Sequence, residues 1–561
     1  MKLTGAQVLC QSLIEEGVEV IFGYPGGVVL PLYDTLPQYP QLRHILVRHE
    51  QGAAHAADGY ARVTGKVGVC LATSGPGATN LVTGVANAFL DSSPVVAITG
   101  QVARHLIGRD AFQEIDITGI TLPMTKHNYL VLDTGLLART VKEAFHLART
   151  GRPGPILIDI PRDVFEEKVE FHYPSQVDLP GYKPTVKGNP LQIKRAARLI
   201  AEAEKPLILA GRGIMISGAC EELAALARAQ QIPVVTTLLG IGCFPEGDEL
   251  SFGMLGMHGM AYANMAVSQA DLIIAIGMRF DDRATGRVNG FAPNARIVHI
   301  DIDPAEIGKN VRVDLPIVGD VGAVLKVLNK QLEPAKNMAW FRQLDDWRRK
   351  HPLDTDGEGD VLLPQYVIEK IDEVTKGEAT IVTGVGQNQM WSAQHYCYNR
   401  PNSLVSSGGL GTMGFELPAA LGAKIGRPQD TVWCIAGDGG FQMTLQELGT
   451  IAQEQAAVKV AILNNGYLGM VRQWQEMFYG KRYVATPITC PDFTKIAEAY
   501  CIPALNVKTR EEVVPAIKKA MAEPGPFLIN FQVEPEENVY PMVAPGAALD
   551  EVIEKPKKGG S

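Results

Sequence analysis

Two polar side chains in the last third of the chain have the types and spacing of a phosphate-binding metal site. Asp438 follows the apolar run 431–436 (TVWCIA), and Asn465 ends a second run at 458–465 (VKVAILNN). The carboxyl ends of parallel strands meet along one edge of a sheet, so we expect both side chains to face the same point. A carboxylate, an amide oxygen and a loop carbonyl are hard ligands that suit Mg²⁺ bridging to a diphosphate. An ordinary strand-turn-helix with a capping aspartate is the alternative interpretation.

The glycines around Asp438 predict how the backbone would approach such a ligand. We expect the strand to end near Ala436 and a tight turn to follow, which Gly437, Gly439 and Gly440 would allow. A helical pattern, TLQELGTIAQ, then begins at residue 444. Backbone N–H groups at a helix start favour an anion, so this turn is a candidate phosphate site.

Glu50, near the other end of the chain, is placed where an acid could do chemistry. It comes shortly after the apolar stretch HILV and precedes an alanine-rich segment, AAHAADGYA. Apolar surroundings raise the pKa of a glutamate, which helps it to exchange a proton with a ligand. The alternative is a solvated surface residue, the common environment of glutamate.

The elements that must position these residues form three blocks, at 1–165, 190–333 and 362–535, followed by a tail at 536–561 whose end we expect to be disordered. Apolar runs such as VGVCLATSG, ADLIIAIGMRF and TVWCIAGDGG alternate with helical patterns. Such runs, bounded by Gly and Pro, are typical of strands buried on both faces of a parallel sheet. We therefore predict an α/β fold of three doubly wound domains with mainly parallel sheets. The polar, proline-bearing segment 166–190 is predicted to be a linker.

Composition excludes several classes of protein. The net charge is −9 and no basic stripe is present, which argues against binding to nucleic acid or to an anionic membrane. The chain has no apolar run of about 18 residues and no secretory pattern at its start, so we expect a cytoplasmic protein. Its eight cysteines form no C-x-x-C pair, so neither a zinc site nor a disulfide framework is predicted.

These motifs together resemble those of thiamine-diphosphate enzymes. G-D-G at 437–439 is followed by N-N, with Asn465 standing 27 positions after Asp438 (465 − 438). The resemblance implies that Asp438 and Asn465 bind Mg²⁺, with the carbonyl of Tyr467 as a third ligand. It also implies that Glu50 hydrogen-bonds to N1′ of the cofactor's aminopyrimidine and supplies its acid–base chemistry.

Two further segments support the same resemblance. GGLGTMGFELPAALG begins at Gly408 and contains Met413, a bulky residue that in this family bends the bound cofactor. SGPGATN, at 74–80, resembles the turn that faces the active site. In relatives, the first and third blocks that share one cofactor belong to different subunits, which implies a homodimer or homotetramer.

Within this group the chain is most similar to the acetohydroxyacid (acetolactate) synthases. The segments that carry this similarity are YPGGVVLPLYD, RDAFQEID, PMTKHNY, GMHGMAYAN, GMRFDDRATG and NGYLGMVRQWQEMFY. The resemblance implies decarboxylation of pyruvate and transfer of its two-carbon unit to a second 2-keto acid. Pyruvate as acceptor gives 2-acetolactate, and 2-ketobutyrate gives 2-aceto-2-hydroxybutyrate, both on the route to branched-chain amino acids.

The same resemblance implies a pocket for the acceptor. Arg283 would grip the acceptor carboxylate bidentately, and Trp474 would contact its alkyl end. Taken alone, an arginine next to two aspartates is more often part of a surface ion pair. The other residues implied are Gly27, Val28 and Phe112 in the pocket and Gln113 and Lys126 as catalytic residues.

The middle block resembles a site for FAD. Its G-x-G at 211–213 is not a full dinucleotide motif, and an ordinary strand-to-helix turn is the alternative. The reaction has no net redox change, so FAD would have a structural role. The residues implied are Arg152, Gly211, Gly213, Thr236, Leu238, Gly256, Met257, His258, Gly277, Arg279, Asp281, Arg283, Asp301, Ile302, Asp320 and Val321.

Other functions on the same scaffold are alternatives. These are pyruvate oxidase, glyoxylate carboligase, the FAD-free catabolic acetolactate synthase and a cofactor-binding paralogue without activity. Glu50 argues against glyoxylate carboligase, which lacks that acid, and Arg283 with Trp474 argues against the two other enzymes. Relatives often bind a small regulatory subunit, which is therefore a possible partner.

Overall fold

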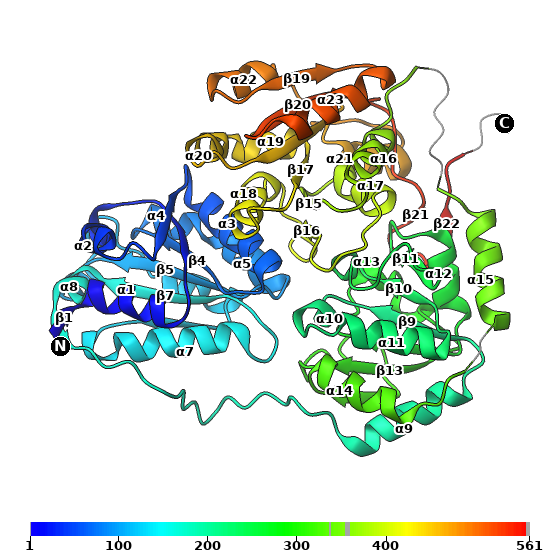
Figure 1. Cartoon of the computed structure of the whole chain (residues 1–561), viewed down its shortest axis with the longest axis horizontal. Helices are drawn as coiled ribbons and strands as arrows, with labels where there is room; N and C mark the ends of the chain where they lie inside the picture. Colours follow the sequence, from blue (N-terminus) through cyan, green and yellow to red (C-terminus); the bar gives the residue numbers. More distant parts are fainter. Residues whose placement is uncertain (1, 336–337, 354–359, 557–561) are drawn as a thin grey trace.

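The computed structural model describes residues 2–335, 338–353 and 360–556. They form three α/β domains, each built on a six-stranded parallel sheet flanked by helices (Figure 1). In each domain, apolar side chains fill both faces of the sheet. The predicted fold class is therefore confirmed.

The N-terminal sheet has the strand order β3-β2-β4-β5-β7-β6. Its strands are β2 (Val20–Gly23), β3 (Arg43–Leu46), β4 (Gly68–Ala72), β5 (Val95–Gln101), β6 (His127–Leu130) and β7 (Ile156–Pro161). Its longer helices are α1 (Gly5–Glu15), α3 (Glu50–Thr64), α5 (Val82–Leu90) and α7 (Leu137–Arg149). A separate antiparallel pair joins β1 (Lys2–Thr4) to β8 (Lys168–Glu170).

The middle sheet has the order β11-β10-β9-β12-β13-β14. Its strands are β9 (Pro206–Ala210), β10 (Val234–Thr236), β11 (Ser251–Met254), β12 (Leu272–Ile276), β13 (Arg296–Asp301) and β14 (Leu315–Val318). Its longer helices are α9 (Pro190–Glu202), α11 (Cys220–Gln230), α12 (Ala261–Gln269), α14 (Val321–Leu328) and α15 (Met338–Lys350). Helix α15 is assigned to this domain because its buried Trp340 donates to the carbonyl of Pro206 at 3.1 Å.

The C-terminal sheet has the order β16-β15-β17-β18-β20-β19. Its strands are β15 (Thr380–Thr383), β16 (Leu404–Ser406), β17 (Val432–Gly437), β18 (Val458–Asn464), β19 (Ala504–Val507) and β20 (Phe527–Gln532). Its longer helices are α16 (Pro364–Thr375), α17 (Gln387–His395), α18 (Glu416–Gly426), α21 (Gly469–Phe478) and α23 (Arg510–Ala522).

Helices α3 and α18 join the N-terminal and C-terminal domains of the same chain. A Cβ atom on Gly59 would lie 2.2 Å from the carbonyl oxygen of Ala419, and one on Gly422 would lie 1.9 Å from that of Ala56. The two backbones therefore approach more closely than any side chain would allow. As a result, the two domains share one continuous apolar core.

Two segments lie outside the three sheets, one between domains and one at the C-terminal end. Residues 171–189 contain no helix or strand and run from the N-terminal domain to α9 along the outside of the molecule (Figure 1). The chain after 536 returns to the middle domain, where the N–H group of Val543 donates to the carbonyl of Met257 at 2.7 Å. Residues 557–561, at the end of the predicted disordered tail, lie outside the described residues. No helix in the described part of the chain is long and apolar enough to cross a membrane.

Candidate functional site

The carboxyl end of β17 holds Asp438 in a buried position. Its Oδ1 accepts a hydrogen bond from the N–H group of Gly439 at 2.8 Å, and its Oδ2 accepts one from Gly466 at 2.7 Å. Burial raises the pKa of Asp438, and these backbone donors act against that change. The bond to Gly466 reaches the turn after β18, so the two predicted halves of the metal site meet here.

Asn465 presents its amide beside the same turn. Its Oδ1 accepts from the N–H group of Tyr467 at 3.1 Å, and its Nδ2 donates to Gln387 Oε1 at 3.2 Å. Within the described residues, no group of three or more His, Cys, Asp or Glu side chains could hold a metal. A cation here would therefore depend on one carboxylate, on amide and carbonyl oxygens, and on the phosphates of a ligand. Those donors fit Mg²⁺.

The backbone next to Asp438 differs from the prediction. Strand β17 ends at Gly437, and helix α19 (Asp438–Thr444) begins directly after it, whereas the sequence pattern predicted a turn and a helix start at Thr444. Gly437 has a φ of −83°, which any residue can adopt, so no left-handed turn is made. The helix start that was predicted to face phosphate thus lies at Asp438 itself, six residues earlier than the expected start at Thr444.

Close packing explains why glycines are found in α19. A Cβ atom on Gly439 would lie 2.7 Å from Leu468 and 3.5 Å from Met413 Cε, and one on Gly440 would lie 2.4 Å from Glu416 Oε1. Met413 therefore lies beside the predicted metal-binding helix start. Glu416 is fully buried, neither of its carboxyl oxygens has a hydrogen-bond partner in the described part of the chain, and burial raises its pKa to about 7. Sequence reasoning missed this acid.

Glu50 begins α3 and is buried at the carboxyl edge of the N-terminal sheet. Its Oε2 accepts a hydrogen bond from Asn80 Nδ2 at 2.9 Å. Asn80 ends the predicted SGPGATN turn, which forms α4 (Pro76–Asn80) after Gly75, whose φ is +58°. Within the described residues, Asn80 is the hydrogen-bond partner of this buried carboxyl, and its role toward a cofactor stays a prediction.

Other predicted residues share that edge with Glu50. Gly27 and Val28 follow β2, and Phe112 and Gln113 follow β5. Strands β3, β2, β4 and β5 are neighbours in the sheet, so their carboxyl ends bring these residues together. Phe112 is 88% exposed, so its ring is largely open to solvent in a single chain.

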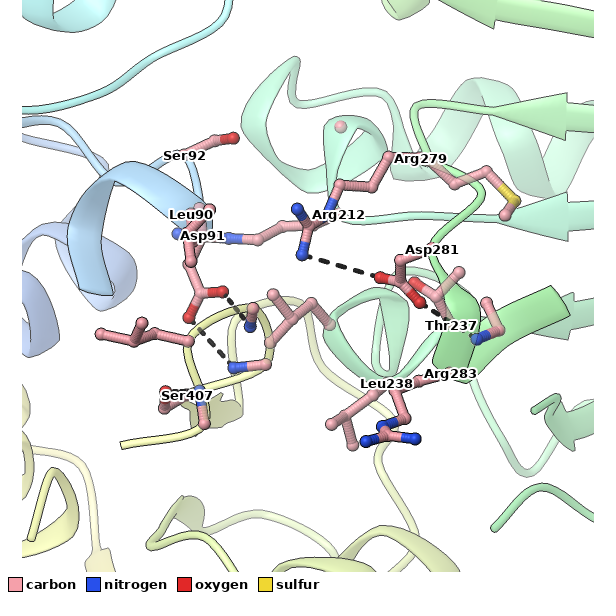
Figure 2. Close-up of a pocket in the computed structure, with 18 of the residues that line it drawn as sticks. Leu90, Asp91, Ser92, Arg212, Thr237, Leu238, Arg279, Asp281, Arg283 and Ser407 are labelled. Carbon is pink, nitrogen blue, oxygen red and sulfur yellow. Dashed lines mark hydrogen bonds and ion pairs between the residues drawn. The ribbon is translucent and has the colours of Figure 1, made fainter. Parts of the chain in front are cut away.

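A large central cavity, of about 1640 Å³, lies where the three domains meet. Figure 2 shows part of its wall, with Arg279 and Asp281 forming an ion pair at 3.6 Å. The predicted residues that line it are Arg152, Gly213, Leu238, Met257, His258, Gly277, Arg279, Asp281, Arg283, Asp301, Ile302, Asp320, Val321, Gly408, Met413 and Trp474. Gly211, Thr236 and Gly256 are sequence neighbours of lining residues.

The structure separates the predicted flavin residues from the predicted catalytic ones. The N-terminal domain reaches the cavity through residues 90–92 and 146–153, which precede β5 and β7 and so lie at the amino edge of its sheet. Glu50 and Gln113 lie at the opposite, carboxyl edge, and neither lines the cavity. Within one chain, Glu50 therefore does not face Met413.

Lys126 also lies away from Glu50. Its Nζ donates to the carbonyl of Thr150 at 2.8 Å, to Tyr182 Oη at 3.2 Å, and to the carbonyl of Leu147. Burial lowers the pKa of Lys126 to about 8. The structure thus gives Lys126 a role in holding the loop before β7, and its catalytic role stays a prediction.

The middle domain contributes more of the cavity wall than either other domain, largely from loops at its strand ends. Gly213 and Gly277 allow two loops to touch, because a Cβ atom on Gly213 would lie 2.7 Å from Gly277 Cα. Burial raises the pKa of Asp301 to about 7, and Asp320 caps α14 through the N–H group of Ala323 at 2.9 Å. These acids at strand ends, above a glycine-rich turn, fit the hydroxyls of a nucleotide.

Arg283 and Trp474 meet at the cavity, although they come from different domains. The guanidinium carbon lies 5.9 Å from the centre of the indole ring, and the nearest carboxylate, that of Asp282, lies 3.5 Å from Nη1. The Arg283 side chain is 60% exposed. Nη1 donates to Met257 Sδ at 3.7 Å, and the exposed guanidinium can still meet a ligand beside its aromatic neighbour, a combination that suits a small acid with an alkyl tail.

Asp91, Ser92 and Arg212 line the same cavity and were missed by sequence reasoning. They follow an ordinary helix or strand, and nothing in their spacing marks them. A buried aspartate after a helix gives a weak signal on its own, and only the folded chain shows what it contacts.

Comparison with known proteins identifies the family of this chain. Three models of thiamine pyrophosphate enzymes match the chain: the N-terminal TPP binding domain at 3–120, the central domain at 193–328 and the C-terminal TPP binding domain at 384–531. The acetolactate synthase of Mycobacterium leprae is 54% identical over 98% of this chain and 90% of that protein. The acetolactate synthase large subunit of Corynebacterium glutamicum is 50% identical over 98% and 90%, respectively. A probable acetolactate synthase large subunit of Methanocaldococcus jannaschii is 49% identical over 98% and 95%. The chain belongs to the acetolactate synthase family of thiamine pyrophosphate enzymes.

Proposed function

We propose that this protein is an acetolactate synthase that joins two 2-keto acids with loss of CO₂. Pyruvate is the donor, and pyruvate or 2-ketobutyrate is the acceptor. The observation that carries the choice among related enzymes is the meeting of Arg283 and Trp474 at the cavity, 5.9 Å apart. A cation and an indole side by side suit an acceptor with a carboxylate at one end and a short alkyl group at the other.

Thiamine diphosphate and Mg²⁺ are the cofactors that the C-terminal domain would hold. Asp438, Asn465 and the carbonyl of Tyr467 would bind the cation, and the start of α19 would face the diphosphate. Met413 would support the rings. When bound, thiamine diphosphate supplies a carbon nucleophile and an electron sink for decarboxylation.

Glu50 is the residue that would hold a proton at the pyrimidine ring. Its buried carboxyl has Asn80 as its hydrogen-bond partner, and it does not face the cavity of its own chain. The predicted site is completed if Glu50 of a second copy faces the C-terminal domain of the first. We therefore propose a homodimer as the smallest active unit, which can pair further into a tetramer.

The middle domain would hold FAD in the central cavity. The ribose and phosphate groups would meet Asp301, Asp320 and the turn at Gly211–Gly213, and Arg152 would meet the cofactor from the N-terminal domain. No electron balance requires the flavin, so its role is structural. Some relatives are named large subunits, and a small regulatory subunit is a corresponding partner for this chain.

Product identification tests the proposed activity. Purified protein is incubated with pyruvate, Mg²⁺, thiamine diphosphate and FAD, and the products are separated and identified. The proposal expects 2-acetolactate, and 2-aceto-2-hydroxybutyrate when 2-ketobutyrate is added. Acetaldehyde or acetyl phosphate as the main product would assign a different reaction on the same scaffold, and no product would favour a paralogue without activity.

A further inference from the structure

Asp91 connects the N-terminal domain to the loop that leads to Met413. It follows α5 directly and is only 2% exposed. Its Oδ1 accepts from the N–H group of Gly409 at 2.6 Å and its Oδ2 from Gly408 at 3.1 Å, as Figure 2 shows. One carboxylate thus fixes two successive backbone N–H groups of a loop more than three hundred residues away in sequence.

An ionic network inside the N-terminal domain holds that carboxylate in place. Arg62 donates to Asp91 at 2.8 Å and to both oxygens of Asp58 at 2.7 and 2.9 Å, and all three side chains are buried. Arg62 also donates to the carbonyl of Ser406 at 2.5 Å, at the start of the same loop. Since buried charges with several partners have little freedom, the network is a rigid support for the loop.

A second layer of the same network fixes the rest of the loop. Asn87 donates to Asp58 at 2.8 Å, and its Oδ1 accepts from Ser407 Oγ at 2.6 Å and from Thr412 Oγ1 at 3.0 Å. Ser407 Oγ in turn accepts from the N–H group of Thr412 at 2.9 Å. The loop from 406 to 412 is therefore tied at both ends to one face of the N-terminal domain.

The other side of Asp91 belongs to the wall of the central cavity. Arg152, a predicted flavin residue, donates through Nε to Ser92 Oγ at 2.8 Å. Arg212 donates to the main-chain carbonyl of Asp91 and to Ser93 Oγ at 3.1 Å. A continuous chain of hydrogen bonds therefore runs from two cavity-lining arginines, through the turn at 91–93, to the loop that precedes Met413.

We propose that Asp91 is a positioning residue that couples the flavin site to the thiamine diphosphate site of the same chain. The inference rests on the proposed function, because it needs both cofactors. A flavin that orders Arg152 and Arg212 also orders the turn at 91–93, and the Asp91 carboxylate transmits that order to the loop at 408–413. Each cofactor then binds more tightly when the other is present, and linkage requires the effect to be reciprocal.

The test compares the dissociation constant of thiamine diphosphate, with Mg²⁺ present, for flavin-free and flavin-loaded protein. Calorimetry on the full-length protein provides this constant without any turnover. We expect flavin to tighten binding by about 5-fold to 150-fold, the usual range of coupling between sites. In Asp91→Asn, one acceptor oxygen becomes an NH₂ donor. The ratio of the dissociation constant of flavin-free protein to that of flavin-loaded protein should then fall to within about twofold of one.

Asp58→Asn is the matched control. It removes an equally buried carboxylate from the same arginine but leaves both bonds from Asp91 to the loop. Because Asp58 supports the loop only indirectly, through Arg62 and Asn87, this variant should retain more of the coupling than Asp91→Asn even where its thermal stability falls as much. Ser92→Gly keeps Asp91 and removes the hydroxyl that Arg152 contacts, so it should reduce the ratio if Asp91→Asn fails to fold.

Three results would overturn the inference. The first is a ratio near one in the wild-type protein. The second is an unchanged ratio in Asp91→Asn or, if that variant does not fold, in Ser92→Gly. The third is a loss of the ratio in Asp58→Asn that is as large as the loss in Asp91→Asn. Failure of the proposed function is recognised separately, from absent flavin binding or from absent acetolactate. If acetolactate forms and both cofactors bind while Asp91→Asn keeps the wild-type ratio, only the coupling role is wrong.

Discussion

Replacing Trp474 with leucine should reduce the preference for the longer acceptor. The indole lines the cavity beside Arg283 and is itself braced by Phe478, whose ring centre lies 5.7 Å away at an angle of 74°. 2-Ketobutyrate differs from pyruvate by one methylene group. The indole would contact that group, whereas the carboxylates of the two acceptors are identical.

The size of the effect follows from the placement of Trp474. One methylene in an apolar pocket is worth about 1–3 kcal/mol, or roughly 10–200-fold in selectivity. Trp474 is only partly buried, and leucine retains some apolar surface, so we expect a loss at the lower end of this range, about 1–2 kcal/mol or 5–30-fold. The assay is a competition with both acceptors present, and the measured quantity is the ratio of the two acetohydroxy acids.

Two further variants make this test specific. Phe478→Leu removes the ring that braces Trp474. Because Phe478 does not itself line the cavity, this variant should change the product ratio far less. Arg283→Lys replaces a bidentate clamp with a point charge and should impair both acceptors to the same extent. An unchanged product ratio in Trp474→Leu would mean that the acceptor pocket has been placed wrongly.

The remaining predictions concern protons and the metal. Glu50→Gln should slow exchange of the C2 proton of bound thiamine diphosphate by about 10²–10⁴-fold; exchange at the wild-type rate, followed by NMR, would refute the role of Glu50. Asp438→Ala should weaken cofactor binding in a Mg²⁺-dependent manner, and equal wild-type affinities with and without a chelator would contradict the metal site. Burial raises the pKa of Asp159 to about 7, against about 4 in an unfolded chain. The native state therefore holds an extra proton between these pH values, so stability falls as pH rises from about 4 to 7. Asp159→Asn should lack this loss, on the order of a few kcal/mol, and denaturant titrations at several pH values would show parallel curves for both proteins if the reasoning is wrong.

Strand ends were the part of the site that could be predicted from sequence. Apolar runs followed by Glu50, Asp438 or Asn465 indicated polar groups at the carboxyl edge of parallel sheets, and the structure places them there. Local patterns suffice in these cases because a strand and the residue after it are adjacent in sequence. The depth of burial and the hydrogen-bond partners could not be predicted in the same way.

Glycine was the residue whose meaning was misjudged. Glycines at 437, 439 and 440 suggested a tight turn, because glycine readily adopts left-handed conformations. In the structure, Gly439 and Gly440 are helical, and a side chain at either position would meet Leu468 or Glu416, which come from other elements. Sequence alone does not reveal which distant side chain fills the space beside a glycine.

The network around Asp91 shows the same limit more clearly. Arg62 and Asp91 belong to the N-terminal domain, whereas the backbone groups that they bind across the domains lie at 406–409. No local periodicity relates these two segments. Their association depends on the crossing of α3 and α18, which brings the two domains of one chain together.

The central claim, condensation of two keto acids without net redox change, is tested most directly by product stoichiometry measured together with flavin absorbance. Purified protein loaded with thiamine diphosphate, Mg²⁺ and FAD is given pyruvate, and CO₂, acetolactate and the oxidised-flavin band are followed in one experiment. We predict one acetolactate and one CO₂ for every two pyruvates consumed, with the flavin oxidised throughout. Bleaching of the flavin in proportion to CO₂, with acetyl phosphate or acetate in place of acetolactate, would contradict the account and indicate an oxidase.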